Sequence, residues 1–94
     1  MANLNYNKLA LNIFGEMAFE NAESPIADTQ QFITVLENLL NACEPEYKTA
    51  VVKALSGEEL SVEEKSNYAI GLRYLKHPAQ SGKLRPFLNN YLNA

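Results

Sequence analysis

The sequence predicts an all-α protein: a compact bundle of four main helices followed by a short C-terminal helix. Three observations lead to this prediction. Apolar residues recur at helical spacing, prolines and glycines separate the periodic segments, and no alternating apolar–polar run bounded by turns indicates a strand. The 94 residues suffice for one domain, and no linker or internal repeat divides residues 1–94. We therefore expect a single helical domain.

The first helix is expected to run from about Asn5 to Glu20. Its polar positions, Lys8, Asn12, Glu16 and Glu20, recur every four residues, and nearly all other positions are apolar. A helix that is apolar over most of its circumference is buried on more than one side. We expect this helix either to occupy the centre of the bundle or to be covered in part by another subunit.

The second helix is expected to end near Ala42, and its start has two alternatives. Ser24 can cap a helix that has Pro25 in its first turn, or Asp28 can cap it, with Gln31 completing a pair that resembles a capping box. An apolar stripe at helical spacing marks the face that we expect to be buried, and it consists of Phe32, Leu36, Leu39, Leu40 and Cys43.

The third helix is predicted from the way it begins and ends. Glu44-Pro45 restarts the chain, and the apolar pattern stops near Leu55. Gly57 follows at the position where a glycine commonly terminates a helix. These signals indicate a short helix between two turns.

The fourth helix has the strongest start signal in the chain. Ser61 and Glu64 form a Ser-x-x-Glu capping box, and the helix is expected to continue to about Lys76, where His77-Pro78 stops it.

The segment after this stop is expected to be a loop over residues 78–83, with Gly82 as a hinge. A last short helix is then predicted from about Arg85 to Leu92, with Pro86 in its first turn.

Two glycines lie inside predicted helices. Gly15 falls in the first and Gly71 in the fourth, where each costs about 1 kcal/mol relative to alanine. Because glycine has no side chain, we expect that these positions let the two helices cross at close distance.

Charge is distributed unevenly along the chain. All 11 acidic residues lie in residues 1–64 with three of the eight basic ones, so the net charge of −3 divides into −8 there and +5 in residues 65–94. Such asymmetry can mark an interaction surface. The candidate anion or partner surface consists of Arg73, Lys76, Lys83 and Arg85. The candidate acidic partner surface consists of Glu16, Glu20 and Glu23.

The acidic candidates crowd the C-terminal end of the first predicted helix, where the helix dipole is already negative. A cation should offset them, and the basic C-terminal segment is the natural source. Pairing within the chain or between subunits is the favoured interpretation, and a surface for a different partner is the alternative.

Residues that carry chemistry are few. His77 and Cys43 are the only histidine and cysteine, too few for a typical zinc site and without an evident third group to orient a nucleophilic pair. We therefore expect no catalytic residues, no metal and no cofactor, and hence no enzyme. The single cysteine, the lack of a signal peptide at the start and the absence of an apolar run of about 20 residues favour a cytoplasmic protein without membrane contact.

The leading hypothesis for function is a protein-binding module of inhibitor, immunity or adaptor type, which occludes or bridges a partner. It rests on the wide apolar coverage of the first two predicted helices, whose leftover surface another protein or a second copy of the chain would bury. In helix number and length the chain resembles the small helical bacteriocin immunity proteins, and this resemblance implies action by occlusion.

Two alternatives belong to other classes. One is a small regulatory protein that binds an anionic ligand or nucleic acid through the basic C-terminal third, where Tyr74 and Tyr91 could stack on a base. The acidic total makes nucleic acid the less favoured ligand. The other alternative is a subunit of an oligomeric enzyme with a site assembled between chains.

Overall fold

The computed structural model describes residues 5–20 and 23–89, and it confirms the all-α class. Within these ranges no strand forms. The α-helices are α1 (Tyr6–Phe14), α2 (Thr29–Asn41), α3 (Pro45–Leu55), α4 (Val62–Lys76) and α5 (Pro78–Leu84). Two short 3₁₀ helices, η1 (Glu16–Ala18) and η2 (Arg85–Phe87), follow α1 and α5.

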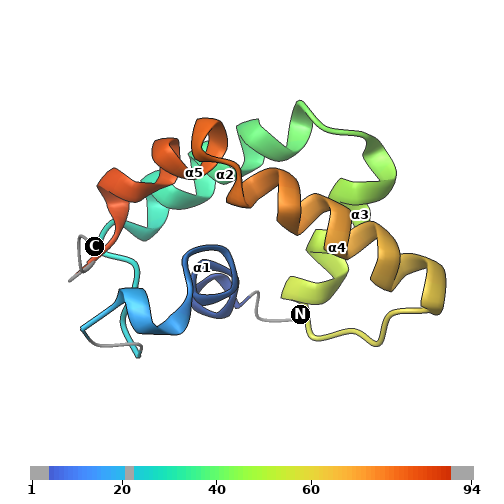
Figure 1. Ribbon diagram of the computed structural model, residues 1–94, viewed down its shortest axis with the longest axis horizontal. Helices are drawn as coiled ribbons and strands as arrows, with labels where there is room; N and C mark the ends of the chain where they lie inside the picture. The colour runs from blue at the N-terminus through green and yellow to red at the C-terminus, as the bar shows by residue number, and fades with distance from the viewer. Residues whose placement is uncertain (1–4, 21–22, 90–94) are drawn as a thin grey trace.

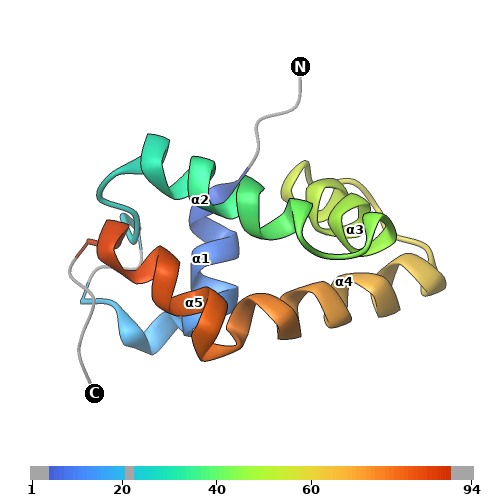
Figure 2. The same ribbon diagram turned by 90° about the horizontal axis from the view of Figure 1, so that it is seen from above.

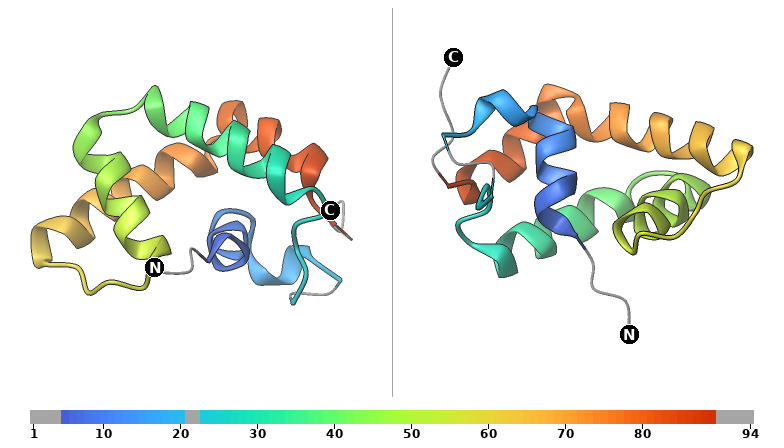
Figure 3. Two further views of the ribbon diagram at one scale, coloured as in Figure 1. Left: turned by 180° about the vertical axis from the view of Figure 1, so that it is seen from behind. Right: turned by 90° about the horizontal axis from the view of Figure 1, so that it is seen from below.

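The helices form two rows with a crossing helix beneath them. α4 and α5 follow one another along the longest axis, α2 lies beside α5, and α1 lies below (Figure 1). Seen from above, α1 crosses between α2 and the α4–α5 row (Figure 2). α3 descends from the end of α2 toward the start of α1 (Figure 3). The backbone N–H of Asn5 donates to the carbonyl of Leu55 (2.9 Å) and links the start of α1 to the end of α3.

The core lies where α1 faces the two rows. Burial of each large apolar side chain there is worth about 1.5–3 kcal/mol. In α2 the stripe is confirmed at Phe32, Leu36, Leu39 and Leu40, whereas Cys43 lies beyond the end of the helix and is half-buried. The other large apolar members of the core are Leu9, Ile13, Ile26, Val51, Leu55, Leu75 and Leu84.

The predicted first helix is too long, because α1 ends at Gly15. This glycine has φ +90° and ψ 137°, a conformation that L side chains rarely adopt, and its N–H donates to the carbonyl of Leu11 (2.8 Å). The turn lets Phe19 pack edge-on against Phe14, with ring centroids 6.4 Å apart, and it leaves Met17 92% exposed. The expected continuous apolar surface over residues 5–20 is therefore wrong beyond Phe14.

The start of α2 agrees with the second alternative. Oδ1 of Asp28 accepts the N–H of Gln31 (3.1 Å), whereas Pro25 lies before the helix, outside any regular element. Residues 25–28 pair instead with the chain after α5: Ile26 and Leu88 form an isolated antiparallel bridge, and the N–H of Asn89 donates to the carbonyl of Pro25 (2.7 Å). This pairing supplies the backbone partners that a helix would otherwise have provided.

The predicted ends of α3 and the predicted start of α4 are confirmed. Gly57, at φ +78°, donates its N–H to the carbonyl of Ala54, and Glu58 donates to that of Lys53, both at 3.1 Å, which is a Schellman motif. At α4, Ser61 Oγ accepts the N–H of Glu64, and Glu64 Oε1 accepts the N–H of Ser61. The capping box is therefore complete.

The loop expected over residues 78–83 is wrong, because these residues form α5. His77 ends α4 with ψ 136°, and its Nδ1 then accepts the N–H of Ala79 (3.2 Å), so it caps the next helix. Pro78 occupies the first helical position, where its missing N–H costs nothing and its fixed φ suits a helix. His77 and Pro78 thus end α4 and begin α5. Gly82 lies inside α5 rather than at a hinge.

The predicted final helix, from Arg85 to Leu92, is also wrong within the described residues. Only η2 is helical, and Leu88 is extended, with φ −91° and ψ 149°. The pairing with residues 25–27 holds this part of the chain out of a helix. Residues 90–92 lie outside the described ranges.

The expectation that the first and fourth helices cross at Gly15 and Gly71 is wrong, because Gly71 faces α3 rather than α1. A Cβ on Gly71 would lie 3.0 Å from Val51 Cγ2 and 3.4 Å from the carbonyl oxygen of Tyr47, so the close approach joins α4 to α3. A Cβ on Gly15 would meet no atom within 4 Å, so this glycine serves only to terminate α1.

Candidate functional site

The four basic candidates are spread over three consecutive elements. Arg73 and Lys76 lie in the last turn of α4, Lys83 lies in the last turn of α5, and Arg85 begins η2. All four are exposed. Arg73, Lys76 and Lys83 form no ion pair with any residue of the described ranges.

Two adjoining grooves run over the surface formed by α2, α4 and α5, which we call the α2–α4–α5 surface. The first, of about 440 Å³, lies between α4 and α5 and is lined by Ile70, Arg73, Tyr74, His77, Ala79 and Gln80. The second, of about 660 Å³, lies between α2 and α5 and is lined by Val35, Asn38, Leu39, Ala42, Tyr74, Gln80, Lys83 and Phe87. Tyr74 and Gln80 belong to both linings, so they form the ridge between the two grooves.

The ridge is held by a hydrogen bond across helices. The hydroxyl of Tyr74 donates to the carbonyl of Leu39 (3.1 Å), which fixes the ring between α4 and α2. The structure thus places Arg73 at one groove and Lys83 at the other. Lys76 and Arg85 belong to neither lining. Sequence reasoning identified the cations but not the apolar grooves, because the grooves exist only where three helices meet.

The acidic candidates lie in the irregular segment between α1 and α2. Glu16 opens η1, Glu20 follows it, Glu23 lies in a turn, and all three are exposed. Because α1 ends at Gly15, these carboxylates do not crowd the C-terminus of one helix, and that premise is wrong. Neither Glu16 nor Glu20 forms an ion pair with a residue that the structure describes.

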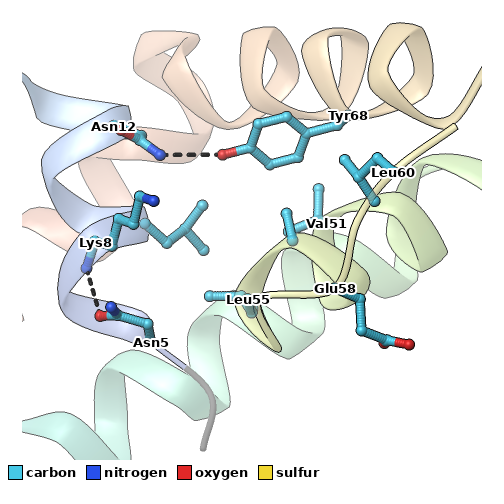
Figure 4. A pocket seen from close by; sticks show the side chains of 11 residues that line it. Asn5, Lys8, Asn12, Val51, Leu55, Glu58, Leu60 and Tyr68 are labelled. Atoms are coloured by element: carbon cyan, nitrogen blue, oxygen red, sulfur yellow. Dashed lines mark hydrogen bonds between the residues drawn. The ribbon is translucent and has the colours of Figure 1, made fainter. Parts of the chain in front are cut away.

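A third hollow, of about 350 Å³, lies between α1, α3 and α4 (Figure 4). Its polar members include Lys8 and Asn12 of α1 and Tyr68 of α4, and Asn12 Nδ2 donates to the Tyr68 hydroxyl oxygen (3.1 Å). Val51 and Leu55 of α3 line its apolar side. No sequence pattern indicated this pocket, since its members are up to 63 residues apart in the chain (Asn5 to Tyr68).

His77 and Cys43 have separate structural roles. The imidazole of His77 caps α5, and Sγ of Cys43 donates to the carbonyl of Leu40 (3.0 Å). Burial raises the pKa of the Cys43 thiol, and burial together with the charge of Glu37 raises the pKa of Tyr6. Neither Cys43 nor Tyr6 lines the grooves or the pocket, so these shifts do not mark a reactive group there.

Within residues 5–20 and 23–89, no three His, Cys, Asp or Glu side chains converge to hold a metal ion. None of the helices in these ranges has the length and apolar character needed to cross a bilayer.

No protein-family model, curated protein or solved structure matches the chain.

Proposed function

We propose that the protein is a protein-binding module of inhibitor, immunity or adaptor type, and that it occludes or bridges an acidic partner through the α2–α4–α5 surface. The observation that supports this proposal is the Tyr74–Gln80 ridge, which separates two apolar grooves edged by Arg73 and Lys83. Protein interfaces are enriched in tyrosine and arginine, and their strongest contacts are aromatic and arginine anchors beside apolar pockets.

The chemistry of this surface favours a protein over a small ligand. Both grooves have more apolar than polar lining, and Ile70, which lines the first groove, is 41% exposed. Covering such a surface removes apolar area from water. Arg73 and Lys83 then select the sign of the partner's charge and accelerate its approach.

The test is a pull-down from the native cells, with and without nuclease, in which recovered proteins are identified by mass spectrometry. Wild type is compared with the double charge reversal Arg73→Glu/Lys83→Glu and with a matched control, Lys48→Glu/Lys65→Glu, which changes the net charge equally at positions outside the α2–α4–α5 surface. Circular dichroism verifies that each variant is folded. A stoichiometric protein recovered with wild type and control, but lost with the groove variant, supports the proposal.

Retention of that partner by the groove variant contradicts the proposed surface. Recovery of nucleic acid alone, before nuclease treatment, favours the second candidate, an anion-binding regulatory protein that uses the same cations. One observation weighs against base stacking in that candidate: the ring of Tyr74 is half-buried and its hydroxyl is bonded to Leu39. Tyr91 lies outside the described residues.

A further inference from the structure

The pocket between α1, α3 and α4 has one polar end and one apolar side. Its volume of about 350 Å³ falls at the small end of the range typical of ligand sites, about 300–1,000 Å³. It is separate from the α2–α4–α5 surface, and the two linings have no residue in common.

The polar end presents hydrogen-bond donors. Lys8 and Asn12 are one turn apart on α1, and Figure 4 shows the Lys8 ammonium on the same side of the pocket as Asn12 and the Tyr68 hydroxyl. Because the hydroxyl oxygen of Tyr68 accepts from Asn12, its own proton is available to another acceptor. Lys8 forms no ion pair with any residue in the described part of the chain. Within residues 5–20 and 23–89, the Lys8 ammonium and the Tyr68 hydroxyl proton therefore have no protein acceptor.

The opposite side of the pocket is apolar. Val51 and Leu55, one turn apart on α3, and Leu60 from the following loop lie across from the donors (Figure 4). The acid in the lining, Glu58, extends away from Lys8 and Tyr68 in the same view, and it forms no ion pair with Lys8.

We propose that this pocket binds a small monocarboxylate with a short apolar tail. The carboxylate accepts charge-assisted hydrogen bonds from Lys8 and a further bond from the Tyr68 hydroxyl, while the tail lies against Val51, Leu55 and Leu60. The same donors give a neutral polar ligand only weaker bonds, and a ligand without an apolar part loses the burial against α3. This activity goes beyond partner binding and does not depend on it.

The first experiment is a titration of the ¹⁵N-labelled protein, followed by NMR, with sodium hexanoate and with its neutral counterpart hexanamide. Hexanoate should shift the amide signals of α1 and α3 residues around the pocket in a saturable manner. Hexanamide should bind about tenfold more weakly, because it lacks the charge that Lys8 recognises. Equal affinity for the two compounds, or hexanoate shifts confined to the α2–α4–α5 surface, would overturn the proposal.

Variants assign the contacts. Lys8→Gln should weaken hexanoate binding about tenfold and leave hexanamide binding nearly unchanged, whereas the matched control Lys65→Gln, at an exposed position outside the pocket, should change neither. Tyr68→Phe should weaken hexanoate binding by a smaller factor. Ala54→Leu, at a half-buried position in the lining, should fill the apolar side and abolish binding of both compounds.

Lys8 is exposed, so its variant remains folded and decides the question if Ala54→Leu disturbs the helix. Unchanged hexanoate affinity in Lys8→Gln would refute the assignment of the carboxylate to this end of the pocket. Loss of the partner in the pull-down has no bearing on this result, because the two sites share no residue.

Discussion

The ammonium nitrogen of Lys53 lies 2.6 Å from Oε2 of Glu64, and this ion pair joins the last turn of α3 to the first turn of α4. The other carboxylate oxygen, Oε1, accepts the N–H of Ser61 (2.9 Å). Glu64 is therefore both the reciprocal member of a capping box and a tertiary contact. Two hydrogen bonds lower the pKa of Glu64 from 4.5 to about 2. The bond from Lys53 contributes most, and the bond from the Ser61 backbone comes second.

This shift predicts a pH dependence of stability. A carboxylate whose pKa is lower in the folded state contributes stability that is complete above its unfolded pKa, near 4.5, and that is lost as the pH falls toward about 2. Glu64→Gln should therefore be less stable than wild type near neutral pH, and the two proteins should converge as the pH falls through this window. Thermal unfolding followed by circular dichroism at a series of pH values measures the difference.

The control for this experiment is Glu63→Gln, a neighbouring exposed position in the same turn. Its difference from wild type should stay small, since an exposed acid near a helix start contributes about 0.3–1 kcal/mol through the helix dipole. If the difference between wild type and Glu64→Gln is the same at every pH, the ion pair and the cap do not act through the charge of Glu64.

A second prediction concerns the contact between α3 and α4. Replacing glycine by alanine inside a helix ordinarily stabilises it by about 1 kcal/mol. At Gly71 the new methyl group would meet Val51, which is fully buried and cannot withdraw, and the backbone of Tyr47. We expect Gly71→Ala to lower the free energy of unfolding by about 1 kcal/mol, because overpacking exceeds the gain in propensity.

Gly82→Ala is the matched control, since Gly82 is exposed within α5 and a Cβ there meets no atom within 4 Å. It should raise the free energy of unfolding by up to about 1 kcal/mol in urea denaturation. Equal stabilisation by both substitutions would show that α3 and α4 do not approach as closely at Gly71 as the structure has them.

Local signals explain which parts of the fold could be predicted. Asp28 and Ser61 cap helices through side chains that reach only three residues along the chain, and Gly57 ends a helix by its own conformation. Because each of these signals acts within one turn, the sequence alone contains them.

The predictions that are wrong concern segments whose conformation depends on residues far away in the sequence. Residues 25–28 stay out of a helix because they pair with residues 87–89, and the same pairing excludes the helix predicted from Arg85. The grooves and the pocket also depend on helices that are far apart in the sequence. The cations Arg73 and Lys83 could be identified from the charge pattern, but the apolar grooves that they border could not.

The end of α1 gives a third prediction. Gly15 has φ +90° and ψ 137°, a conformation that costs a residue with a side chain about 1–3 kcal/mol. Gly15→Ala should lower the free energy of unfolding by this amount, although the site has open space around it. Urea denaturation measures the loss. If Gly15→Ala leaves the free energy of unfolding unchanged, α1 can continue past residue 15, as the sequence pattern alone suggests.

The last prediction concerns the thiol of Cys43, which donates to the carbonyl of Leu40 (3.0 Å) and is half-buried. Burial raises its pKa above 9.0, with a further contribution from Glu44, and this outweighs the lowering by its backbone hydrogen bond and by Lys48. Since the thiolate is the reactive species, the folded protein contains less of it at a given pH than an unperturbed thiol would. Alkylation by iodoacetamide, followed by mass spectrometry at a series of pH values, should therefore be slower for the folded protein than for the same protein in urea, and its midpoint should lie at higher pH. Equal rates in the two states would show that the segment after α2 leaves the thiol open to solvent, and that the hydrogen bond to Leu40 does not hold it in place.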